Sequence, residues 1–122
     1  MNTRIYRVIT PHETEFADPI TFKTGATLEV GEESEGYQGW ENWFFCATPG
    51  QEPGWVPGQI IERGEGSTGR ALEDYTAREL NVHRGEKVAG SRILNGWLWC
   101  ERCDEPGTVG WVPLQNLEEI PE

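Results

Sequence analysis

The sequence contains one short pattern twice, as PGWVPGQIIE at residues 53–62 and as VGWVPLQNLE at residues 109–118. In both copies Gly-Trp-Val-Pro is followed by one residue, a Gln, two further residues and a Glu. Two uncommon residue types, Trp and Pro, recur in the same order, so we interpret the pattern as an internal repeat. A repeat decides the architecture of a chain, and it is therefore the starting point for the fold.

The match extends towards the N-terminus when the two copies are aligned. The segment NWFFCA (42–47) falls on GWLWCE (96–101), and ITFKTGATLEV (20–30) falls on LNVHRGEKVAG (80–90). These segments agree, while the connections between them differ in length. Such a pattern is typical of a duplicated folding unit that fills half of the chain.

The composition fits two small units better than one large one. Of 122 residues, 36% are apolar and 11% are aromatic, and six of the aromatic residues are Trp. A unit of about 60 residues buries only about 60% of the surface of its unfolded chain, so it depends on side chains that bury much area each. We therefore expect two small domains that the Trp residues help to stabilise.

Short strands dominate the local signals in both halves. TLEV (27–30) alternates apolar and polar residues, and the segments 43–47 and 97–101 are rich in aromatic residues, as strands are. The segments 48–53 and 103–108 contain Pro and Gly and are typical of hairpin turns. No stretch keeps a helical period for ten residues. The sequence therefore predicts an all-β protein of two small five-stranded barrels in tandem, since closure removes sheet edges.

The segment RGEGSTGR (63–70) lies between the halves and indicates a flexible linker, because it combines three Gly with Ser and Thr. We expect a first barrel at 1–64, a Gly-rich linker at 65–68 and a second barrel at 69–122. The only helix expected is a single turn after each Gly-Trp-Val-Pro. The expected core residues are Val8, Ile20, Phe22, Leu28, Cys46, Val56 and Ile61 in the first barrel, and Ala71, Leu80, Val82, Val88, Cys100, Val112 and Leu117 in the second.

The net charge of −11 bears on the class of partner. Phosphate groups bind Lys and Arg, so an acidic balance argues against nucleic acid and against an anionic membrane surface. No apolar run approaches the ~20 residues of a membrane span, and the N-terminus lacks the apolar region of a signal peptide. We expect a cytoplasmic protein whose acidic surface serves solubility or suits basic partners.

The sequence CERC at 100–103 raises the question of a metal site. A structural zinc site needs four ligands, whereas the chain has three Cys and two isolated histidines, His12 and His83. Residues three apart on a strand also point to opposite faces. We interpret Cys46 and Cys100 as buried apolar residues and Cys103 as an exposed free thiol.

No catalytic motif is evident in the sequence. It has no Gly-rich phosphate loop and no Ser or Cys with a plausible His partner. His12 is interpreted as a solvated loop histidine, with a role in a binding groove as the alternative. We expect a non-catalytic protein with no cofactor and no metal.

Several features of the second half occur in a characteristic order: ALEDY (71–75), an apolar pair before a Gly (80–85), Trp97 and Gly-Trp-Val-Pro (110–113). Together they resemble the SH3 (Src homology 3) family, whose domains open on Ala-Leu-Tyr-Asp-Tyr. The first half resembles it too, with VITPH (8–12) at the opening motif. The chain thus looks like a tandem SH3 protein of the variant or bacterial type.

The resemblance implies a groove that binds proline-rich peptides in a left-handed extended conformation, beside acidic residues that pair with Arg or Lys of the peptide. In the second half the implied groove residues are Tyr75, Trp97, Trp111 and Pro113, with Glu73 and Asn116 in place of aromatic residues and Glu79 as the acid. In the first half they are Trp43, Trp55 and Pro57, with His12 and Ile60 at aromatic positions and Glu15 and Asp18 as acids. The resemblance also implies that Trp43 and Trp97 face solvent.

Two functions follow from these expectations. The first is a non-catalytic tandem adaptor that binds short peptides weakly, proline-rich and basic ones among them, as a monomer or a weak homodimer. The alternative is a structural module for assembly, in which the Trp faces bury each other within the chain or in a homodimer. Retention of Trp and Pro in both halves favours peptide binding, whereas the loss of groove aromatics favours assembly.

Overall fold

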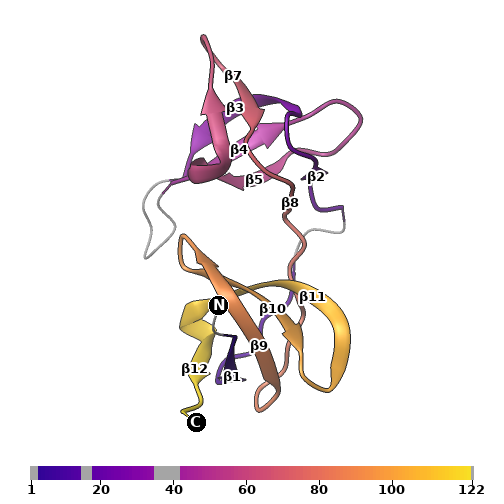
Figure 1. Ribbon diagram of the computed structural model, residues 1–122, viewed down its shortest axis with the longest axis vertical. Helices are drawn as coiled ribbons and strands as arrows, with labels where there is room; N and C mark the ends of the chain where they lie inside the picture. The colour runs from indigo at the N-terminus through magenta and orange to yellow at the C-terminus, as the bar shows by residue number, and fades with distance from the viewer. Residues whose placement is uncertain (1–2, 15–17, 35–41, 122) are drawn as a thin grey trace. The chain divides into compact units, whose positions relative to one another are not determined.

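A computed structural model of the chain describes residues 3–14, 18–34 and 42–121. Figure 1 shows strands joined by turns, and the described residues contain no helix other than two 3-10 turns, Gly58–Ile60 and Leu114–Asn116. Each turn directly follows a Gly-Trp-Val-Pro, as predicted, and the all-β class is confirmed. None of the helices in these ranges is long and apolar enough to span a membrane.

Two five-stranded antiparallel sheets and one two-stranded sheet account for the strands. The first large sheet has the order β5 (Gly54–Pro57), β4 (Trp43–Ala47), β3 (Thr27–Glu33), β7 (Thr68–Ala71) and β6 (Ile61–Arg63). The second has the order β11 (Glu105–Pro113), β10 (Trp97–Arg102), β9 (Lys87–Leu94), β1 (Arg4–Val8) and β12 (Leu117–Glu119). The small sheet pairs β2 (Thr21–Phe22) with β8 (Tyr75–Thr76). These orders describe open sheets, so closure into barrels is not shown.

The sheets divide the chain differently from the expected boundaries. Unit 1 consists of Met1–Glu15 together with Arg78–Glu122, and unit 2 consists of Phe16–Ala77. Figure 1 shows the reason: the indigo strand β1 lies in the sheet with the orange strand β9. Conversely, β7 of the second half pairs with β3 and β6 of the first. Each half of the sequence therefore contributes its opening strand to the other half's sheet, an arrangement that we call the strand exchange.

The two opening strands make the same hydrogen bonds in their new surroundings. Gly25 donates its backbone N–H to the carbonyl of Ala71 at 2.7 Å, and Gly85 donates to the carbonyl of Val8 at 2.8 Å. Both glycines have a positive φ, +88° and +91°, which a residue with a side chain adopts only under strain. Because these positions correspond in the repeat, either sheet can accept either opening strand. Pattern matching along one half therefore cannot tell which copy supplies it.

The expected linker is a hairpin turn between β6 and β7. Ile61 pairs with Ala71 and Arg63 with Gly69, so the chain reverses within residues 64–67. The backbone N–H of Gly64 donates to the carbonyl of Thr68 at 2.9 Å, which closes the turn. Gly, Ser and Thr are as favourable in tight turns as in flexible linkers. The linker interpretation was wrong because composition alone does not distinguish the two.

All fourteen of the expected core residues are buried, but two of them lie in the other core. The core of unit 1 consists of Tyr6, Val8, Leu80, Val82, Val88, Leu98, Cys100, Val112 and Leu117. Val8, which was expected in the first core, is fully buried here, where a Val side chain contributes about 1.5–3 kcal/mol. Ala71, which was expected with the residues of unit 1, pairs with Ile61 in unit 2. The strand exchange accounts for both corrections.

The strand exchange predicts how the chain behaves after a cut in the turn 64–67. A protease site inserted there yields one fragment that ends in the turn and one that begins in it. Each unit contains strands from both fragments, so we expect the cut protein to remain one folded complex in native mass spectrometry and size-exclusion chromatography. Two separately eluting folded fragments would contradict the exchange, and the uncut variant is the control.

Candidate functional site

Each unit carries a cross-strand aromatic pair that includes the Trp of the repeated tetrapeptide. In unit 2 the rings of Phe45 and Trp55 lie 5.1 Å apart, and in unit 1 those of Trp99 and Trp111 lie 5.2 Å apart, both in edge-to-face geometry. The partners stand directly opposite each other on neighbouring strands. The Val that follows each tetrapeptide Trp is fully buried, while Trp55 is half-buried and Trp111 is only 5% exposed.

The two tryptophans that open β4 and β10 are buried. Trp43 and Trp97 are each 5% exposed, so the expectation that they face solvent is wrong. In the sheets they stand opposite Pro57 and Pro113, respectively. At Trp97 the ring of His12 also packs edge-on, with 5.5 Å between the ring centroids. Ring-shaped neighbours of this kind remove the indole from water.

His12 and Glu79 form the central polar contact of unit 1. The imidazole Nε2 lies 2.7 Å from the carboxylate Oε1, and the two side chains are only 17% and 16% exposed. The backbone of Glu79 in turn bridges to that of Trp111. We call the cluster of His12, Glu79, Trp97 and Trp111 the unit 1 site. His12 was expected in the first groove or as a solvated loop residue, and the strand exchange places it here instead.

Asn116 serves the fold of unit 1. Its side chain is buried, and its amide nitrogen donates to the backbone carbonyls of Thr10 at 3.2 Å and Pro11 at 3.1 Å. Its backbone carbonyl accepts the N–H of Ile9 at 2.8 Å. Buried amides need such partners, and here they hold the opening segment on the sheet. Asn116 thus holds the N-terminal segment, whereas the resemblance had implied a peptide contact.

Tyr75 lies in unit 2, where it replaces His12 at the corresponding position. Its hydroxyl donates to the backbone carbonyl of Trp55 at 2.9 Å, and its ring packs against Phe22 with 5.5 Å between centroids. The cluster of Tyr75, Trp55 and Phe45 is called the unit 2 site. Tyr75 had been assigned to the groove of Trp97, so this assignment is corrected by the strand exchange.

The remaining predicted site residues have varied surroundings. Ile60 is 1% exposed and belongs to the buried residues, so it offers no surface to a ligand. Pro57 and Pro113 are also buried, Glu73 is half-buried and Asp18 is exposed. Glu15 lies outside the described residues. The unit 1 site and the unit 2 site therefore retain only part of the residue sets implied by the resemblance.

Asp74 anchors the opening strand of unit 2 and was not predicted to do so. Its Oδ1 accepts the backbone N–H of Thr24 at 2.8 Å and the Thr24 hydroxyl at 3.0 Å, and Lys23 approaches its Oδ2 to 3.7 Å. The hydrogen bonds from Thr24 lower the pKa of the Asp74 carboxyl below its ordinary value of 3.8. The contact is therefore fully present above that pH and is lost as the pH falls through the lower pKa of the folded state.

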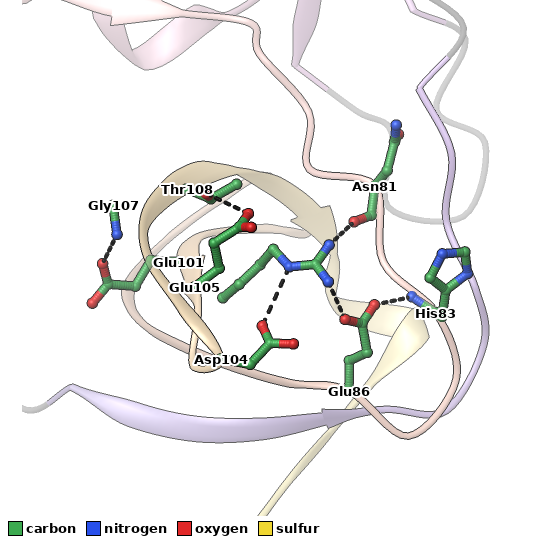
Figure 2. A network of polar contacts seen from close by, with 9 residues as sticks. Asn81, His83, Glu86, Glu101, Asp104, Glu105, Gly107 and Thr108 are labelled. Atoms are coloured by element: carbon green, nitrogen blue, oxygen red, sulfur yellow. Dashed lines mark hydrogen bonds and ion pairs between the residues drawn. The ribbon is translucent and has the colours of Figure 1, made fainter.

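Figure 2 shows a polar network that includes Asn81, Glu86 and Asp104. These three residues are contacted by the guanidinium of Arg102, at the end of β10. Arg102 donates to the backbone carbonyl of Asn81 at 3.0 Å, to the carboxylate of Glu86, and to that of Asp104 at 3.4 Å. Glu86 also accepts the backbone N–H of His83 at 2.6 Å. Burial would lower the pKa of Arg102, but the charges of Glu86 and Asp104 outweigh it and raise that pKa. The network ties the turn 81–86 to the end of β10.

The acidic residues of the adjoining hairpin are engaged within that hairpin. Glu101 accepts the backbone N–H of Gly107 at 3.1 Å, and Glu105 accepts the hydroxyl of Thr108 at 2.7 Å. In Figure 2 these contacts lie on the hairpin beside the network. The cluster thus stabilises a turn, and it is no evidence of a ligand site. In the sequence, the signal for this network is Arg102, which ends the aromatic segment 97–102 and is followed by the acidic residues Asp104 and Glu105.

Replacing Arg102 tests the network. Arg102→Met retains the stem of the side chain but removes the guanidinium donor from Glu86 and from the Asn81 carbonyl, so we expect a loss of about 1–3 kcal/mol in the free energy of unfolding. Urea denaturation measures the change. Arg84→Met, at an exposed position of the same turn, is the matched control and should cost less than about 0.5 kcal/mol. Equal losses in the two variants would refute a specific role for Arg102.

The three cysteines differ in burial as expected. Cys46 and Cys100 are 0% and 2% exposed, and Cys103 is exposed. Burial raises the pKa of Cys46 to about 11 and that of Cys100 to about 12. Within the described ranges, no three His, Cys, Asp or Glu residues are grouped so as to hold a metal ion.

These differences predict the order of thiol modification. The thiolate is the reactive form, so at pH 8 a disulfide reagent should label Cys103 rapidly and label Cys46 and Cys100 only after unfolding. The absorbance of the released thiol, followed with and without urea, gives the rates. Cys103→Ser is the control, because it should remove the rapid phase alone. Equal rates for all three thiols under native conditions would contradict the burial.

Comparison with known proteins matches the second half of the chain to a family model. Residues 68–120 match the family model described as "Variant SH3 domain". This match, together with the relatives described next, supports an SH3 protein. The mouse and human proteins named "SH3 and PX domain-containing protein 2B" are each 27% identical over 130 residues, which cover 93% of this chain and 13% of the relative. The zebrafish (Danio rerio) "SH3 and PX domain-containing protein 2A" is 30% identical over 92 residues, or 75% of this chain and 8% of the relative.

The chain thus spans only a small part of the length of these relatives. No solved structure matches it. The matched segment starts at residue 68, so it includes β7 and β8, which lie in unit 2. The segment that matches the family model is therefore continuous along the chain, but its first strands lie in unit 2 and the rest of it lies in unit 1.

Proposed function

We propose that the chain is a non-catalytic module of two SH3-like barrels that binds short basic, proline-containing peptides. An SH3 domain suggests a protein-interaction role, and the unit 1 site supplies the observation that carries the peptide preference. There the carboxylate of Glu79 contacts the imidazole of His12, whose ring packs against Trp97, and the backbone of Glu79 bridges to that of Trp111. Aromatic faces accept proline rings and cations, and a carboxylate beside them selects Arg or Lys.

The overall charge supports the same class of partner. A net charge of −11 attracts basic segments over distances of about 8–10 Å at physiological salt and raises their rate of association. A cytoplasmic location is part of this proposal, since the exposed free thiol of Cys103 suits a reducing compartment.

The affinity of each site should be modest. Ile60 and Asn116, which stand where aromatic residues would enlarge a groove, are both buried. Their side chains add little contact area for a ligand. We therefore expect dissociation constants on the order of 10 μM to 1 mM, or about −4 to −7 kcal/mol.

Assembly through the tryptophan faces is the second candidate. Trp55 and Trp99, which are half-buried, are available for such an interface, whereas Trp43 and Trp97, each 5% exposed, are already covered and are poor contacts for any partner. Light scattering coupled to size-exclusion chromatography separates the two candidates. A stable dimer that fails to bind peptide supports assembly, and a monomer that binds peptide supports recognition.

A peptide titration followed by backbone amide shifts in NMR tests the recognition function. The probe is a short capped peptide with one arginine beside a run of prolines, added to the full chain. Amides of the unit 2 site should shift, and Trp55→Ala should weaken this binding about tenfold or more, since it removes the half-buried ring beside Phe45.

Ile93→Ala is the control for that variant. Ile93 is apolar and 48% exposed, but it lies on β9, outside both sites, so its replacement should leave the affinity unchanged. Binding should also weaken as salt rises beyond about 0.15 M, because exposed charge pairs are screened. If millimolar peptide shifts no amide in either unit, the recognition function is refuted.

A further inference from the structure

One position of the repeat carries different residues in the two units. His12 pairs with Val82 in unit 1, just as Tyr75 pairs with Phe22 in unit 2. The His12 imidazole is engaged with a carboxylate, that of Glu79, at 2.7 Å. The Tyr75 hydroxyl is engaged with a neutral acceptor, the backbone carbonyl of Trp55. The contacts described for this position therefore differ: the partner is a carboxylate in unit 1 and a backbone carbonyl in unit 2.

The imidazole of His12 is held in place from several sides. Its backbone N–H donates to the carbonyl of Val82 at 3.0 Å, and the N–H of Val82 donates back to His12 at 2.9 Å. Its ring rests edge-on against Trp97. Asn116 fixes the preceding residues Thr10 and Pro11 through their carbonyls. A histidine fixed in this way keeps its contact with Glu79 without further ordering.

We propose that His12 acts as a built-in competitor at the unit 1 site. Its imidazole occupies the Glu79 oxygen that a cationic side chain of a ligand would use, so a basic peptide must displace His12 before it can pair with Glu79. In unit 2 the residue at the corresponding position is Tyr75, whose hydroxyl donates to the backbone carbonyl of Trp55. This inference rests on the proposed peptide-binding function and specifies how one of its two sites is restrained.

The restraint has a measurable size. A hydrogen bond to a charged group must be broken before the ligand gains its own, and such bonds are strong enough that losing one changes an equilibrium about tenfold or more. An arginine can replace it with two parallel bonds to the carboxylate, so the restraint weakens binding at unit 1 without abolishing it. Removing the imidazole nitrogen should therefore increase the affinity of unit 1 for a cationic peptide.

The test compares two peptides on the full chain, the arginine–proline peptide and the same peptide with citrulline in place of arginine. Citrulline keeps the shape of the side chain but lacks its charge. His12→Phe retains a ring against Trp97 and removes the hydrogen bond to Glu79. We expect it to strengthen binding of the arginine peptide at unit 1 about tenfold, with little change for the citrulline peptide. The backbone amides of Trp111 and Trp55 report on unit 1 and unit 2 separately.

Three further variants complete the design. Glu79→Gln should bring the arginine peptide at unit 1 down to the affinity of the citrulline peptide. His83→Phe changes the exposed second histidine, outside the unit 1 site, and should leave both affinities as they are. His12→Ala replaces His12→Phe if the latter does not give the dispersed amide spectrum of the folded chain.

The outcomes separate the inference from the function beneath it. Peptide binding at unit 2, together with an unchanged arginine affinity at unit 1 in the His12 variants, overturns the competitor role alone. An equal gain for both peptides also overturns it, because the gain would then not depend on charge. If no amide of either unit shifts in any variant, the peptide-binding function fails and the inference fails with it.

Discussion

Each five-stranded sheet depends on an inner strand that comes from the other half of the sequence. β1 lies between β9 and β12, and β7 lies between β3 and β6, so without its exchanged strand each sheet would lose its connection to its last strand. The backbone hydrogen bonds from Gly85 to Val8 and from Gly25 to Ala71 fix these strands at equivalent points. The hydrophobic core of unit 1 therefore includes Tyr6 and Val8 of the exchanged strand.

The two candidate sites follow from the same constraint. The residues that follow β1 and β7 remain in the unit whose sheet the strand has joined. As a result, His12 lies beside Glu79 and Trp97, and Tyr75 lies beside Trp55 and Phe22. Two repeats of similar sequence thus acquire sites of different chemistry, one with an engaged carboxylate and one with a tyrosine. The distinction arises from which strand completes which sheet, and it does not require different folds.

Much of this structure could be predicted from the sequence. Alternation and aromatic content predicted strands, because these depend on local pattern. The burial of the fourteen expected core residues and the short turn after each Gly-Trp-Val-Pro, which followed from the register of the two halves, are also confirmed. The origin of β1 and β7 could not be predicted, since two matching opening segments fit two matching sheets equally well. For the same reason His12 and Tyr75 were assigned to each other's sites. The role of Asn116 was missed because its two acceptors lie in the distant segment that the exchange brings to it.

The strand exchange also has a consequence for inheritance. A duplicated domain whose copies fold separately can lose one copy, or pass it by recombination to another gene, without harm to the other. Here a deletion of either half of the coding sequence would remove strands from each of the two five-stranded sheets. A mutation in the opening strand of one half would change the stability of the sheet formed by the other half, because the strand pairs there. The two halves are therefore expected to be inherited together, although each half carries its own copy of the repeated pattern.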